Sequence, residues 1–158
     1  MKTPVCLLSL LLLTAGCATT QHGQQARRST LRVRTTAYTD SEPGGCKNAV
    51  GRRLASGEIN SASADWSRYP LGTTFRILNT GEVFQIDDYG GALIGTNTID
   101  LYKTSRYRMR DWGVRYVDIQ ILRWGSPERS LEVLRPRASV RKVRSMIASL
   151  KVSHQSEL

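Results

Sequence analysis

Apolar and polar residues alternate in several short segments along the middle of the chain. The clearest are LRVRTTAYT at 31–39 and VRYVDIQILRW at 114–124, where every second side chain faces the same way. A period of two predicts β-strands with one buried face. The same character recurs in shorter segments at 58–64, 74–78 and 82–87. The Asn-Thr-Gly turn at 79–81 predicts that the last two form a hairpin.

Two segments have helical composition instead. KTSRYRMRDWG at 103–113 predicts one small helix that ends at Gly113. Further along, 138–151 predicts a C-terminal amphipathic helix, with one apolar face formed by Val140, Val143, Ile147 and Leu150. Its basic face either is solvated while the helix packs on the domain, or contacts an anionic membrane or wall.

The strand and helix predictions together define a fold class. Six or so short strands and one small helix, at even spacing, are typical of a mostly β protein. Closing the sheet into a barrel, or nearly so, removes exposed sheet edges. We therefore expect a six-stranded β-barrel followed by a C-terminal amphipathic helix.

The chain begins with an export signal. MKTPVCLLSLLLLTAGC has a basic start, a short apolar run and small residues before Cys17, as in a bacterial lipobox. An ordinary cleaved signal with an incidental cysteine is the alternative. The predicted organisation is a lipoprotein signal peptide at 1–16, a polar tether at 17–30, the barrel domain at 31–125 and a basic, partly helical C-terminal extension at 126–158.

The net charge and the cysteine content limit which partners, metal sites and disulfides we expect for this protein. With 23 Lys and Arg against 13 Asp and Glu, the net charge of +10 favours anionic lipids and anionic envelope polymers as partners. Nucleic acid is not expected for an exported protein. If Cys6 is removed and Cys17 is acylated, Cys46 has no disulfide partner. With only two histidines in the chain, we expect no zinc site, no Cys/His nucleophile and no cofactor.

Three aspartates stand beside turns or strand ends with apolar or aromatic neighbours: Asp65, Asp88 and Asp100. In TIDLY at 98–102, strand alternation places Ile99 and Leu101 on one side and Asp100 on the other, as for an acid that lines a cleft. Partial burial raises the pKa of a carboxyl group and allows it to donate a proton near neutral pH.

A Gly90–Gly91 pair follows Asp88. Glycine allows positive φ angles and leaves space for a bulky ligand. Acids, glycines and aromatic rings together fit a carbohydrate site, but a divalent-cation site or a solvated loop fits the same composition. The wide spacing of the acids is unlike a compact calcium loop. The residues by themselves leave these alternatives open.

A series of motifs, in a fixed order along the chain, resembles the pattern of a known protein family. TAYT (36–39), LASG (54–57), SADWSRYPLGTTFRI (63–77), IDDYGGALIG (86–95), IDLY (99–102) and WG (112–113) occur in this order. Over residues 31–124 the chain resembles the 3D domain, named for three aspartates, of MltA-type lytic transglycosylases and stationary-phase-survival muralytic proteins. The resemblance implies a double-psi β-barrel that cleaves the bond from N-acetylmuramic acid to N-acetylglucosamine in peptidoglycan and leaves 1,6-anhydro ends.

The resemblance also implies roles for residues. The three aspartates of the family fall on Asp65, Asp88 and Asp100, with Asp100 as the acid/base and Asp88 in its hydrogen-bond network, while Asp87 is a bystander. The substrate-binding residues would be Tyr38, Tyr89, Gly90, Gly91 and Tyr102. Two positions depart from the family pattern: Tyr89 replaces a Thr and Ile94 replaces a Lys. 

The location that follows is the cell envelope. Lipidation at Cys17 would anchor the chain, and Ala18 in place of Asp points to the outer membrane, facing the periplasm, in a Gram-negative cell. The partner would be peptidoglycan glycan strands. The alternative function is a non-catalytic peptidoglycan-binding lipoprotein with the same type of barrel.

Overall fold

A computed structural model describes residues 30–41 and 45–155 of the chain. The predicted signal peptide, the lipidation site Cys17 and the tether up to residue 29 lie outside the described residues. The first element of the described part is a strand, Thr30–Tyr38.

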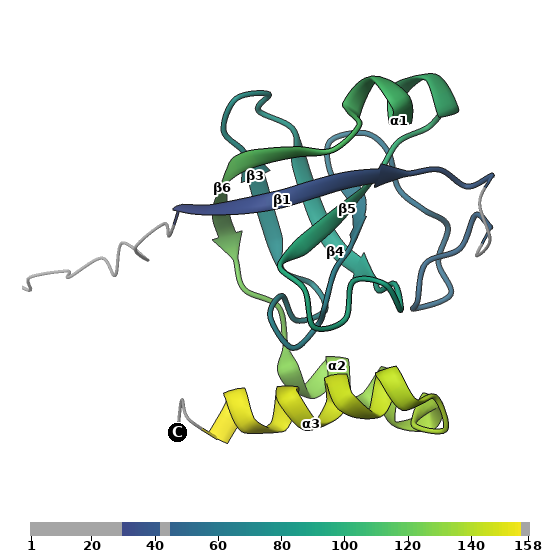
Figure 1. Cartoon of the computed structure of the whole chain (residues 1–158), viewed down its shortest axis with the longest axis vertical. Coiled ribbons are helices and arrows are strands. Elements are labelled where there is room, and N and C mark those ends of the chain that lie inside the picture. Colours follow the sequence, from purple (N-terminus) through teal and green to yellow (C-terminus); the bar gives the residue numbers. More distant parts are fainter. Residues whose placement is uncertain (1–29, 42–44, 156–158) are drawn as a thin grey trace, which may run out of the picture.

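Six strands form a closed barrel in the order β1-β5-β2-β4-β3-β6 (Figure 1). Their bounds are β1 (Thr30–Tyr38), β2 (Asn60–Ser63), β3 (Thr74–Ile77), β4 (Val83–Asp88), β5 (Thr98–Tyr102) and β6 (Arg115–Arg123). The alternating residues of the sequence supply the core, as in β6, where Val117, Ile119 and Ile121 are buried and the residues between them are not. The prediction of a mostly β, six-stranded barrel is confirmed.

The barrel mixes parallel and antiparallel pairs. β1 pairs with β5 in parallel and β2 pairs with β4 in parallel, whereas the other four pairs are antiparallel. The predicted hairpin is confirmed, because β3 and β4 pair antiparallel across the turn. A parallel pair needs a long connection between its strands, so this topology brings together segments that are far apart in the sequence.

Three α-helices accompany the barrel, one more than the two predicted from the sequence. The small helix is α1 (Arg106–Trp112), and Gly113 ends it with φ of 60° and an N–H that donates to the Met109 carbonyl. The unpredicted helix is α2 (Pro127–Leu134), which continues into a 3₁₀ turn, η1 (Arg135–Arg137). Ser126 caps α2 by accepting from the Arg129 N–H, and Leu131 and Leu134 form its buried apolar side.

The last described helix, α3 (Arg141–Gln155), lies beside α2 on the opposite side of the barrel from α1 (Figure 1). Val143, Met146 and Leu150 are buried in the common core. Val140 was expected on this face but is 55% exposed, because it precedes the first turn of the helix. None of the helices in the described part of the chain is long and apolar enough to cross a bilayer.

Candidate active site

One pocket of about 340 Å³ opens where β1, β5, β2 and β4 lie side by side. Two of the three predicted aspartates, Asp88 and Asp100, line it together. Four further residues singled out from the sequence also line it: Tyr38, Tyr89, Gly90 and Gly91. The barrel therefore assembles most of the expected site in one place.

Side chains from four adjacent strands form a row, and three of them, Ser63, Asp88 and Asp100, line this pocket. Thr36 of β1 is in register with Asp100 of β5, Asp100 with Ser63 of β2, and Ser63 with Asp88 of β4. Residues in register on neighbouring strands point to the same face of a sheet. The row thus presents two carboxyl groups, Asp100 and Asp88, on either side of a serine hydroxyl.

A register shift in β2–β4 decides which of two adjacent aspartates joins the row. Ala62 pairs with Ile86, but Ser63 pairs with Asp88, so Asp87 is skipped. Such a bulge redirects the side chains that follow it. Asp87 accordingly lines a different pocket, where its Oδ2 accepts hydrogen bonds from Asn48 Nδ2 (2.8 Å) and Ser61 Oγ (2.6 Å).

The carboxyl group of Asp88 holds its proton more readily than a solvated aspartate. Burial raises its pKa to about 6, and although the Tyr89 N–H opposes the shift, the negative charge of Asp87 adds to it. The Tyr89 N–H donates to Asp88 Oδ1 over 2.9 Å, and the Asp88 backbone carbonyl accepts from the Trp66 indole N–H over 2.8 Å. Asp88 is therefore held firmly on both its side chain and its backbone.

Asp100 receives a short hydrogen bond within the row. The Thr36 hydroxyl donates to Asp100 Oδ1 over 2.6 Å. Because this oxygen accepts from a neighbour on the adjacent strand, the carboxyl group has a defined orientation in the pocket.

The Tyr38 hydroxyl provides a further polar group. It is buried and no hydrogen bond of good geometry satisfies it within the described residues. Burial, followed by the charge of Asp88, raises the pKa of Tyr38, so the phenol stays neutral and can donate a hydrogen bond. The neighbouring Tyr102 ring packs on Tyr38 with a centroid separation of 5.7 Å but does not line the pocket.

The Gly90–Gly91 pair does not serve to adopt positive φ angles. Neither Gly90 nor Gly91 is among the described glycines with positive φ, so that part of the expectation is wrong. A Cβ on Gly91 would meet nothing closer than the Lys142 side chain at 3.9 Å. Gly91 therefore leaves open space at the rim of the pocket, whereas a Cβ on Gly90 would lie 3.4 Å from the Leu93 side chain.

Asp65 lies outside the pocket, although the sequence grouped it with the other acids. Its side chain is only 3% exposed and is used in local hydrogen bonds. Oδ1 accepts from the Ser67 N–H (2.9 Å) and hydroxyl (2.7 Å), and Oδ2 accepts from the Gly95 N–H (2.7 Å). This carboxylate ties the loop after the Gly90–Gly91 pair to the loop after β2.

The structure adds polar residues that the sequence did not single out. Thr36 and Ser63 complete the row, while Lys47 and Thr39 line the pocket beside it. Lys47 is exposed and is the cation among the lining residues, so it could meet an acidic group of a ligand. Thr36 and Thr39 lie in the TAYT motif and Ser63 begins the motif at 63–77, whereas Lys47 lies in none of the motifs.

Comparisons with known proteins assign no family. A scan against protein-family models and a search of curated proteins both find no match. Within residues 30–41 and 45–155, no three His, Cys, Asp or Glu side chains gather into a group that could hold a metal ion. The chemistry of the pocket must therefore be argued from the residues that line it.

Proposed function

We propose that the protein is a lytic transglycosylase that cleaves the bond from N-acetylmuramic acid to N-acetylglucosamine in peptidoglycan. The observation that supports this most is the row that places Asp100 and Asp88 in one pocket. The mixed closed barrel is compatible with the double-psi topology that the 3D-domain resemblance implies. In this proposal the chain is exported and held at the envelope by a lipid on Cys17.

Two carboxyl groups in one pocket suit proton transfer. Placing two negative charges close together in a partly buried site is unfavourable, so the pair retains a proton more readily than solvated acids do. Burial is the main cause that raises the pKa of Asp88 to about 6, and the negative charge of Asp87 adds to it. An acid that is protonated near neutral pH is what cleavage of a glycosidic bond requires.

Asp100 is assigned as the acid and then the base. It donates its proton to the glycosidic oxygen while the bond from that oxygen to C1 of the muramic residue breaks. The ionised Asp100 then takes the proton of the C6 hydroxyl as the C6 oxygen forms a bond to C1, which closes the 1,6-anhydro ring. No water is consumed, and Asp100 ends protonated as it began.

The other residues position the acid and the sugar. The Thr36 hydroxyl orients Asp100, and Asp88 and Ser63 continue the row next to it. Tyr38, Tyr89 and the open Gly90–Gly91 rim would contact the sugar rings. Asp65 is assigned a positioning role through its hydrogen bond to Gly95.

The test is digestion of purified sacculi, with the released fragments identified by mass spectrometry. The wild-type protein should release 1,6-anhydro ends, and Asp100→Asn should lower the rate by about 100-fold or more, since the acid/base is lost. Asp111→Asn is the matched control, because Asp111 is an exposed acid on α1 outside the pocket. Equal rates for wild type and Asp100→Asn, with both proteins folded, would contradict the assignment.

The same digestion separates the alternatives. Reducing ends in place of anhydro ends would indicate a hydrolase. Binding to sacculi with no release by the wild-type protein would instead support a non-catalytic peptidoglycan-binding lipoprotein.

A further inference from the structure

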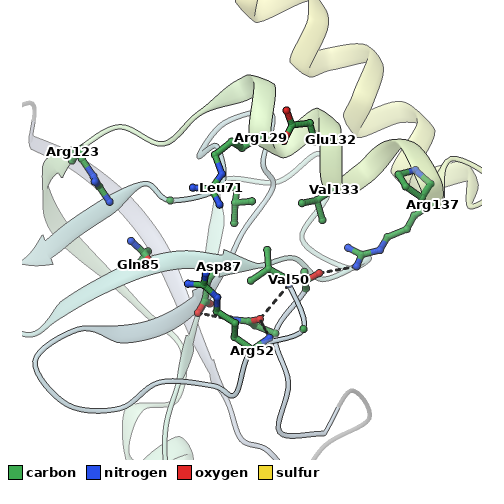
Figure 2. A pocket seen from close by; sticks show the side chains of 15 residues that line it. Val50, Arg52, Leu71, Gln85, Asp87, Arg123, Arg129, Glu132, Val133 and Arg137 are labelled. Carbon is green, nitrogen blue, oxygen red and sulfur yellow. Dashed lines mark hydrogen bonds between the residues drawn. The ribbon is translucent and has the colours of Figure 1, made fainter.

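A second and larger pocket, of about 690 Å³, lies between the barrel and the helices that follow it (Figure 2). Its floor comes from β4, with Gln85 and Asp87, and from the loop that contains Val50 and Arg52. Its other side comes from α2 and η1. None of its lining residues belongs to the pocket of Asp88 and Asp100.

The charge of this pocket is strongly positive. Four guanidinium groups line it, against two carboxylates, Asp87 and Glu132; they belong to Arg52, Arg123, Arg129 and Arg137. Within the described part of the chain, none of these four arginines lies in an ion pair. Arginine binds carboxylates in a planar, two-pronged geometry, so such a cluster favours an acidic ligand.

Buried polar atoms without partners point to the same pocket. Of three such atoms among the described residues, Arg137 Nη1 and Asp87 Oδ1 belong to residues that line it. The other terminal nitrogen of Arg137, Nη2, donates to the Ala49 carbonyl over 2.7 Å, and the other oxygen of Asp87, Oδ2, accepts two hydrogen bonds. Both atoms are shielded from solvent, so a ligand pairs with them only when the Arg137 and Asp87 side chains turn toward the pocket. Such pairing would recover part of the cost of leaving a buried polar atom without a partner.

These two atoms need opposite kinds of hydrogen-bond partner, one an acceptor and the other a donor. Arg137 Nη1 requires an acceptor such as a carboxylate oxygen, and Asp87 Oδ1 pairs best with an N–H group. A peptide with free carboxylates carries both kinds of group, whereas a simple inorganic anion offers only acceptors. We propose that this pocket binds an acidic peptide, with carboxylates on the arginines and an amine or amide N–H on Asp87.

The position of the pocket indicates where that peptide comes from. Asp87 and Asp88 are neighbours on β4 that line the two different pockets, and the Arg137 guanidinium lies 5.8 Å from the centre of the Tyr89 ring, which lines the candidate active site. A polymer with a glycan in one pocket could therefore place an attached peptide in the other. On this basis, which rests on the proposed function, the ligand is the acidic stem peptide of peptidoglycan.

The test measures binding of a synthetic stem peptide with free carboxylates to the full-length chain in detergent by isothermal titration calorimetry. The double variant Arg123→Gln/Arg129→Gln should bind about 10-fold more weakly or worse, since it loses two charged hydrogen-bond donors. The matched control is the single variant Arg110→Gln, an exposed arginine on α1 outside both pockets, which should bind as the wild type does. The same peptide with every carboxylate amidated should not bind.

Three outcomes would overturn the proposal: equal binding of the amidated peptide, equal weakening by Arg110→Gln, or competition by inorganic phosphate at the concentration of the peptide. The Asp100→Asn variant should keep the wild-type affinity. Release of anhydro fragments without peptide binding would therefore reject this site alone. Peptide binding without release would reject the proposed cleavage and leave the site intact.

Discussion

Two adjacent aspartates show how strongly the surroundings decide what a residue can do. Asp87 and Asp88 follow each other on β4 and have the same side chain, yet they line different pockets because of the bulge opposite Ala62 and Ser63. Burial raises the pKa of both carboxyl groups. For Asp88, the cost of keeping its charge in this pocket should be measurable as a loss of stability.

Asp88→Asn should stabilise the protein at pH 8. The pKa of Asp88 is about 6 in the folded chain and 3.8 as a free side chain, so the folded state binds more protons between these values. Stability then falls as pH rises from about 4 to about 6 and is level above that. We expect the variant to gain about 1–2 kcal/mol at pH 8, a value reduced for partial exposure to solvent, and about nothing at pH 3.5.

The measurement is urea unfolding at both pH values. The side chain that contributes to the proposed reaction would then be one that destabilises the fold, as is common at active sites. A gain that is the same at both pH values would show that the charge of Asp88 is not its cause.

Asp65→Ala should act on the fold and not on proton transfer. The variant leaves the N–H groups of Ser67 and Gly95 without their acceptor in a buried region, which should lower the free energy of unfolding by about 2–4 kcal/mol. Thermal unfolding followed by circular dichroism measures the loss. An unchanged melting temperature together with lost cleavage activity would argue for a direct catalytic role instead.

At the scale of elements, the C-terminal helices support the candidate active site. Lys142 on α3 donates to the Gly91 carbonyl over 2.6 Å, and Arg137 on η1 lies over the Tyr89 ring. Met146 Sδ accepts from the backbone N–H of Trp66 over 3.3 Å, and the Trp66 ring packs edge-on against the Tyr89 ring. The rim of the pocket thus depends on residues that lie outside the region of the 3D-domain resemblance.

Met146→Ala tests this support. Met146 is buried at the contact of α3 with Trp66, so its truncation should cost about 2–4 kcal/mol of unfolding free energy. Val152→Ala, on the same helix but 68% exposed, is the matched control and should change stability by less than about 0.5 kcal/mol. Chemical denaturation of both variants provides the comparison, and equal losses would mean that α3 does not pack as described.

At the scale of the whole molecule, one glycine joins the barrel to the helices. Gly125 lies between β6 and α2, where its N–H donates to the Thr73 hydroxyl over 3.0 Å. A Cβ at this position would lie 2.2 Å from the Pro70 carbonyl oxygen and 2.4 Å from that of Leu71. These are backbone atoms, which cannot move aside without opening the junction.

Gly125→Ala should therefore destabilise the protein by about 4 kcal/mol or prevent its folding. Gly91→Ala is the matched control: it adds the same methyl group where only the end of a lysine side chain is near, and should cost less than about 1 kcal/mol. Soluble yield and melting temperature of the two variants test the difference. A Gly125→Ala protein as stable as the wild type would contradict the close approach.

Some of this organisation is predictable from sequence because it depends on near neighbours. Strand alternation predicts β1 and β6 closely, the turn at 79–81 predicts the β3–β4 hairpin, and the composition before Gly113 predicts α1. Helix α2 was missed although its Ser126 cap, its Pro127 and the i, i+3 pair Leu131 and Leu134 are visible in the sequence.

The candidate site, too, has a part that could be predicted from the sequence and a part that could not. The acids, aromatic rings and glycines of 86–102 could be singled out from their composition and order, and Asp88 and Asp100 do share a pocket. Their union with Thr36 and Ser63, the separation of Asp87 from Asp88 and the distance of Asp65 from the pocket come from strand pairing and a bulge. The second pocket likewise exists only because α2 and η1 pack beside β4. Local patterns decide which segments become strands and helices, whereas contacts between distant segments, which no short window of sequence contains, decide which side chains meet.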